Sequence, residues 1–146
     1  MTITLLWLLA VLGPQASHSG APEHFALSAS FKAPAKPGEL GAVAVTFAPK
    51  DPDVVLNEEP APRLKLDPAQ NRLVDKQPPP PARIPAFDPE TARYLDTMFP
   101  VSFPVAWAGK PPASPETLKA DVVYFYCSKR EGWCRKGSAP VEFKVP

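Results

Sequence analysis

The sequence has little cysteine, little histidine and almost no net charge, and each shortage excludes a class of protein. Two cysteines and two histidines among 146 residues could close a four-ligand zinc site only if nearly all of them came together. The formal net charge is +1, whereas nucleic-acid-binding domains carry a strong basic excess. No glycine-rich phosphate-binding loop is present either. We therefore expect no metal, no cofactor and no nucleic-acid partner.

Long apolar runs are also missing, since none reaches the roughly 20 residues that a membrane-spanning helix needs. The longest run, residues 3–12, has the length of the apolar centre of a secretory signal peptide, although no Lys or Arg precedes it. Ser17 and Ser19 are small residues spaced for cleavage after Ser19. The sequence thus predicts a signal peptide at residues 1–19 and a periplasmic or secreted domain at residues 20–146, without stable membrane insertion after signal removal. A buried N-terminal strand is the alternative.

Proline is the residue in excess, at 22 of 146 positions, and half of these prolines lie within residues 49–90. Because proline breaks helices, this content excludes an all-α bundle. Hydrophobic residues make up 45% of the chain and charged residues 21%, which is typical of a folded protein rather than a disordered one. The run Pro78 to Pro81 favours an extended polyproline geometry, either as a stiff surface crossing or as a ligand for a proline-recognising domain.

Apolar residues that alternate with a period of two predict a β protein. The expected longer strands are residues 24–32, 40–48, 101–107, 118–127 and 141–145, with short edge strands at 54–56, 64–66 and 73–74. Pro104 marks 101–107 as an edge strand or a bulge. Residues 88–97 hold the only predicted helix, because Asp88 suits its N-cap. The prediction is an all-β, immunoglobulin-like antiparallel β-sandwich with long proline-rich crossings.

The only concentrated chemistry lies around the two cysteines. Cys127 is expected at the end of one strand and Cys134 just before the next, after a loop over residues 128–138. A hairpin would bring their Cα atoms within the ~4.4–6.8 Å that a disulfide requires. An exported compartment permits such a bond. A metal site formed by both cysteines and His24 is a weaker alternative.

The loop over residues 128–138 is basic. Its cations are Lys129, Arg130, Arg135 and Lys136, and they outnumber a single acid, Glu131. Positive charge beside a thiol favours the reactive thiolate, so the pair could exchange disulfides. Trp133 and the three cations Lys129, Arg130 and Arg135 are then candidate partner contacts. The alternative is an inert staple of about 2.5 kcal/mol inside a solvated basic loop.

Three segments resemble the N-terminal periplasmic domain of the thiol:disulfide interchange protein DsbD. They are Asp121 to Cys127, the triplet Gly132-Trp133-Cys134 and the closing strand 141–145. In that family a strand ends in cysteine, a short loop follows with Gly-aromatic-Cys, and a final strand closes the domain. Upstream, Phe87, with Tyr94 seven residues later, is similar to the family's cap-loop region. The loop between the cysteines is one residue longer here than in the better-known member.

The resemblance implies an immunoglobulin-like sandwich, spanning residues 20–146, that carries reducing equivalents outside the cytoplasmic membrane. It implies a redox-active pair in which Cys134 forms the mixed disulfide and Cys127 resolves it. Phe87, or else Tyr94, would shield the pair. The implied partners are thioredoxin-like exported proteins and a membrane electron donor. The competing hypothesis is a non-redox exported binding or scaffold module whose single disulfide is structural.

Overall fold

The chain folds entirely into β-structure and turns in the part that the structure, a computed structural model, describes: residues 24–70, 72–83 and 88–146. The strands are β1 (Phe25–Lys32), β2 (Gly41–Pro49), β3 (Val54–Leu56), β4 (Arg63–Leu66), β5 (Leu73–Asp75), β6 (Val101–Trp107), β7 (Glu116–Ser128) and β8 (Trp133–Val145). The all-β prediction is confirmed. The short strands expected within the proline-rich stretch are present as β3, β4 and β5. The predicted signal peptide lies outside the described residues.

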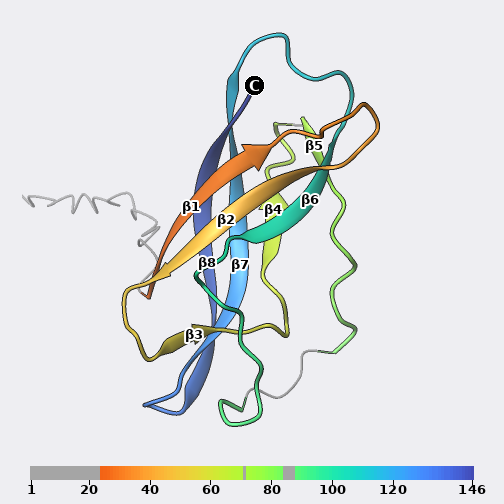
Figure 1. The fold of residues 1–146 in the computed structure, drawn as a ribbon. Coiled ribbons are helices and arrows are strands. Elements are labelled where there is room, and N and C mark those ends of the chain that lie inside the picture. Colours follow the sequence, from red (N-terminus) through yellow and green to blue (C-terminus); the bar gives the residue numbers. More distant parts are fainter. Residues whose placement is uncertain (1–23, 71, 84–87) are drawn as a thin grey trace, which may run out of the picture.

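Two antiparallel sheets enclose one core. The first has the order β1-β2-β6-β5, and in the second β8 pairs with one side of β7 while β3 and β4 pair with the other. In Figure 1 the strands of the first sheet cross over the long β7–β8 hairpin. This arrangement is compatible with the immunoglobulin-like sandwich. The hairpin spans the whole molecule and its turn forms one end of it, which is where the cysteines lie.

The core is built from alternate residues of the long strands, as the period-two pattern predicts. Its centre is an aromatic cluster around Phe25, which is fully buried. The Phe25 ring meets those of Phe47, Tyr124 and Tyr126 edge-on, with ring centroids 6.0, 5.6 and 5.7 Å apart. Such edge-to-face contacts stabilise beyond the area that they bury. The cluster ties β1 and β2 to the end of β7 that leads into the cysteines.

Tyr124 makes the stability of this core sensitive to alkaline pH. Burial raises the pKa of Tyr124 to about 12, and the neighbouring Tyr126 acts in the same direction. An unfolded tyrosine ionises near pH 10, so above that pH the unfolded chain loses a proton that the folded chain keeps. The free energy of unfolding should therefore fall by up to about 1.4 kcal/mol per pH unit between roughly pH 10 and 12. Denaturant unfolding at several pH values gives the free energy of unfolding as a function of pH. Tyr124→Phe should lose less of this free energy per pH unit than the wild type. An equal loss would assign the pH dependence to other groups.

The helix predicted over residues 88–97 is wrong. One helical turn does form, in which the Ala92 N–H donates to the Asp88 carbonyl at 2.9 Å. The chain then runs along the edge of β3, where the Leu95 N–H donates to the Leu56 carbonyl at 2.8 Å. The strand edge satisfies backbone groups that a longer helix would have paired internally. Tertiary pairing thus overrides the local capping signal.

Of the two predictions for β6, an edge strand or a bulge, the edge strand is wrong, because β6 lies between β2 and β5. Pro104 is tolerated there for a local reason. Its carbonyl accepts a hydrogen bond from the Lys76 N–H at 3.0 Å, just beyond the end of β5. The N and O atoms of a strand residue point to the same side, so the proline nitrogen faces the place where this ladder stops.

Candidate functional site

The β7–β8 hairpin places Cys127 and Cys134 directly opposite each other, and a disulfide joins them. The predicted bridge is confirmed by this disulfide, whose Cα atoms, 4.0 Å apart, lie slightly closer than the expected ~4.4–6.8 Å. The turn is tighter than the predicted loop over 128–138, since β8 already begins one residue before Cys134. Gly132 makes this possible with a φ of 73°, and its N–H donates to the Ser128 carbonyl at 2.9 Å.

The two halves of the bridge differ in accessibility. Cys127 is fully buried, whereas Cys134 is half-buried. Both side chains project from the outer face of the hairpin, away from the core, because they alternate with core residues such as Tyr126. Cys127 is nevertheless fully buried, with β3 paired beside it and the Asn57 side chain against its sulfur. A thiol arriving from solution therefore meets Cys134 first.

Sequence reasoning missed Asn57, which directly follows β3 and is fully buried. Its Oδ1 lies 3.2 Å from the Cys127 Sγ. Its backbone N–H donates to the Phe125 carbonyl at 2.8 Å, which fixes it beside β7. The only sequence signal was a single polar residue at the end of an apolar strand, and nothing in the sequence tied that strand to the cysteines. The disulfide thus has a buried amide as its immediate neighbour.

Tyr94, one of the two candidate caps, lies in an isolated antiparallel bridge with Asn57. Its hydroxyl donates to the Pro89 carbonyl at 2.6 Å, and burial raises the pKa of Tyr94. The Lys129 ammonium lies 4.9 Å from the centre of the ring. Tyr94 is therefore fixed beside the backbone of Asn57, the residue whose amide contacts the disulfide. Phe87, the first choice of cap, lies outside the described residues.

Truncating Tyr94 tests the capping role. Tyr94→Ala opens the segment beside the bridge, so reduction by a small thiol such as dithiothreitol should be about fivefold faster, which is about 1 kcal/mol in the barrier. Tyr94→Phe is the matched control, because it keeps the ring and loses only the hydrogen bond to Pro89, and it should reduce at the wild-type rate. Equal rates for wild type and Tyr94→Ala would assign the ring a packing role only.

The positive charge of the loop over 128–138 is partly neutralised by acids from elsewhere in the chain, which the loop sequence does not show. The Arg130 guanidinium pairs with Asp51, at 3.3 Å, and with Asp53. These acids come from the turn between β2 and β3, about 80 positions earlier in the sequence. They offset two of the three excess positive charges. Positive charge alone is therefore not the basis for an activated thiol here.

Trp133 is the first residue of β8, is half-buried, and contacts two aromatic rings, an acid and an arginine. Its ring centre lies 5.7 Å from that of Tyr126 and 5.4 Å from that of His24. The indole N–H donates to Glu131, and the Arg135 guanidinium lies 4.1 Å from the ring centre. The candidate contacts of the loop thus gather around the turn beside the bridge. Their role in binding a partner stays a prediction.

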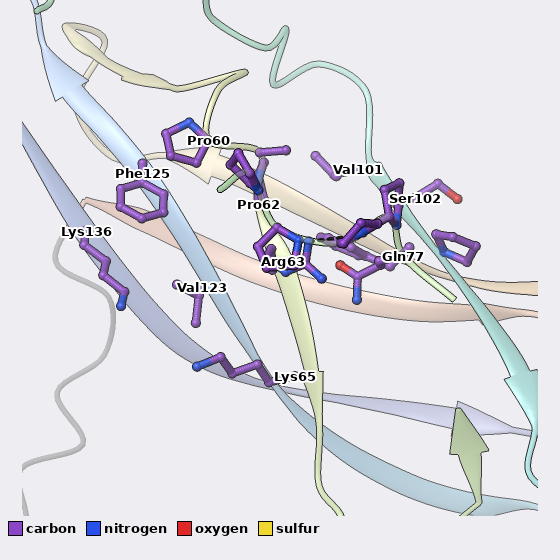
Figure 2. Close-up of a pocket in the computed structure, with 17 residues that line it drawn as sticks. Pro60, Pro62, Arg63, Lys65, Gln77, Val101, Ser102, Val123, Phe125 and Lys136 are labelled. Atoms are coloured by element: carbon purple, nitrogen blue, oxygen red, sulfur yellow. Dashed lines mark hydrogen bonds between the residues drawn. The ribbon is translucent and has the colours of Figure 1, made fainter. Parts of the chain in front are cut away.

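A groove of about 550 Å³ lies on the outer face of the hairpin, with neither cysteine in its lining. Figure 2 shows Val123 and Phe125 on one side of this groove, with Lys136 beside them and Lys65 below. Proline rings from 60–62 and 78–81 supply much of the remaining wall. Phe125 is two residues from Cys127, and Lys136 is two residues from Cys134. Among the residues that the structure describes, no Asp or Glu lines the groove, which is apolar with a cationic rim.

The comparisons with known proteins add no support to the resemblance seen in the sequence. Within the described ranges, no helix is long and apolar enough to cross a membrane, and no three His, Cys, Asp or Glu side chains gather around a metal-sized space. No family model matches the chain, and searches of curated proteins and of solved structures gave no match. None of these comparisons identifies a DsbD-like domain, so the resemblance stays an expectation from the sequence segments quoted above.

Proposed function

We propose that this protein is an exported thiol–disulfide exchange domain that passes reducing equivalents to thioredoxin-like partners. The observation that carries the proposal is the unequal burial of the bridged pair at the end of a hairpin. Cys134 is half-buried and Cys127 is fully buried directly opposite it. An exchange pair needs one sulfur that a partner can reach and a second that can attack from within.

The chemistry balances as two successive exchanges. In the dithiol form, the Cys134 thiolate attacks a partner's disulfide, which forms a mixed disulfide and releases one partner thiolate. The Cys127 thiolate then attacks the Cys134 sulfur, which restores the intramolecular bridge and expels the second partner thiolate. Two electrons pass to the partner. A dithiol protein at the membrane, as the resemblance implies, would reduce the bridge again.

The reduction potential of the bridge tests this proposal. A structural disulfide in an exported protein has a potential below about −300 mV, whereas an exchanging pair lies well above it. Equilibration with a dithiothreitol redox buffer, followed by thiol alkylation, gives the value. Reduced thioredoxin should also reduce the bridge faster than an equal concentration of dithiothreitol. A potential below that limit, with no reduction by thioredoxin, would leave the bridge as a staple.

A second candidate function is a non-redox binding module, and the groove favours it. Its apolar wall and its cations suit a ligand with an aromatic body and an anionic group. Lys65 and Lys136 make no ion pair within the part of the chain that the structure describes. The anionic dye anilinonaphthalene sulfonate is a suitable probe. Lys136→Glu should weaken its binding, whereas Lys144→Glu, elsewhere on β8, should not.

A further inference from the structure

We infer that Asn57 is a positioning residue that favours the dithiol form of the Cys127–Cys134 pair and so makes the bridge easier to reduce. The inference rests on the proposed exchange function, because a pair that must give up and regain electrons needs an accessible potential. The observation behind it is a fully buried amide whose Oδ1 lies 3.2 Å from the Cys127 Sγ. The amide can form a hydrogen bond with a cysteine thiol, and the oxidised bridge offers it no such partner.

In the bridged state this amide is poorly satisfied. A disulfide sulfur carries no proton, so the contact between Oδ1 and Sγ is not a hydrogen bond. Among the residues that the structure describes, no group accepts from the Asn57 Nδ2. A buried polar group without a partner destabilises the state that contains it by about 1–3 kcal/mol. The oxidised state carries that penalty.

Asn57 cannot turn away to find another partner. Its backbone N–H donates to the Phe125 carbonyl at 2.8 Å, and on the other side its backbone pairs with that of Tyr94 in an isolated β-bridge. The neighbouring Leu56 carbonyl accepts from the Leu95 N–H, also at 2.8 Å. Because the residue has no exposure to solvent, bulk water does not reach its amide. The fixed backbone and this burial together keep the side chain beside the sulfur in both redox states.

Reduction supplies the missing hydrogen bond. The dithiol of the membrane electron donor gives two electrons and two protons and is itself oxidised to a disulfide, the Cys127–Cys134 S–S bond breaks, and both cysteines become thiols. The Cys127 S–H then donates to the Asn57 Oδ1. If the amide is rotated by 180°, its Nδ2–H instead donates to the Cys127 sulfur, which favours the thiolate. In both orientations the reduced sulfur is the better partner, so Asn57 shifts the equilibrium toward the dithiol.

The test is the reduction potential of Asn57→Leu, which keeps the side-chain size and removes both polar atoms. The equilibrium constant with a dithiothreitol redox buffer should shift by about tenfold toward the disulfide, which is about 30 mV more negative. A looser fold would separate the thiols and shift the potential the other way, so the sign separates the inference from simple destabilisation. An unchanged or less negative potential would overturn it.

Ser128→Ala is the matched control. Ser128 is the other buried polar residue of the described chain, and its Oγ accepts from the Glu131 N–H in the turn at 3.1 Å. Its loss relaxes the turn without touching the sulfur, so the potential should stay at or above the wild-type value. A shift equal to that of Asn57→Leu would assign the effect to buried polarity in general and overturn the inference.

A spectroscopic measurement keeps the inference testable if Asn57→Leu does not fold. In Cys134→Ala the thiol of Cys127 stands alone beside Asn57, and its S–H infrared stretch should lie at the lower frequency of a hydrogen-bonded thiol. A stretch at the frequency of a free thiol overturns the inference. None of these readouts uses a thioredoxin-like partner. A shifted potential without protein exchange would therefore retain the role of Asn57 and reject the proposed function.

Discussion

A Cys127→Ala variant should accumulate a covalent adduct with a thioredoxin-like protein. The remaining Cys134 lies half-buried at the end of the hairpin, where a partner's sulfur can reach it. Once the mixed disulfide forms, no second thiol within this chain can attack it, because the chain has only two cysteines. The partner should lack its resolving cysteine and carry its remaining cysteine as a mixed disulfide with thionitrobenzoate, so that the Cys134 thiolate forms the adduct by expelling thionitrobenzoate. Non-reducing gel electrophoresis should then show the adduct. Reductant should release the partner unchanged.

The reciprocal variant, Cys134→Ala, is the control. It leaves Cys127, which is fully buried with the Asn57 side chain against its sulfur, so a partner's sulfur has little access to it. We expect on the order of tenfold less adduct than with Cys127→Ala, because exchange rates depend on access to the attacked sulfur. Equal trapping by the two variants would contradict the assigned roles. No trapping by either, together with a bridge that resists thioredoxin, would favour the binding module.

Features that depend on neighbouring residues were predictable from the sequence. The alternation from Leu118 to Tyr126 predicted a central strand with one face in the core. The spacing of Cys127 and Cys134 predicted a hairpin disulfide. Both are local, since side chains alternate along any strand and a tight turn brings its two flanks together. The length of the turn was overestimated, since a loop over 128–138 was predicted and β8 begins at Trp133. The residues after Cys134 are polar, yet they pair with β7 up to the turn.

Features that depend on distant pairing were not predictable. Asn57 meets Cys127 across 70 positions, and Asp51 meets Arg130 across 79, because β3 joins the edge of β7. Nothing in a single sequence specifies that pairing. Gly137 is a further example, since a Cβ there would lie 2.6 Å from the Tyr124 ring. The sequence shows a glycine in a basic loop, whereas the structure shows an aromatic ring that needs its space.

The aromatic cluster around Phe25 should dominate the stability of the protein. Phe25 is fully buried, and it joins β1 to the rings of Phe47 and Tyr124. Phe25→Ala removes all of its ring contacts and leaves a cavity, so the free energy of unfolding should fall by about 3–5 kcal/mol. That loss should lower the melting temperature by roughly 10 °C or more.

Phe99→Ala is the control for this loss, because Phe99 is 68% exposed and contributes little to the core. Its effect should stay within about 0.5 kcal/mol. Chemical denaturation of both variants, with the disulfide intact, measures the difference directly. Since Phe25 also packs on Tyr126, one residue before Cys127, its removal should loosen the bridged end of the hairpin and speed reduction of the bridge by dithiothreitol. A loss under about 1 kcal/mol would contradict the central place given to this ring.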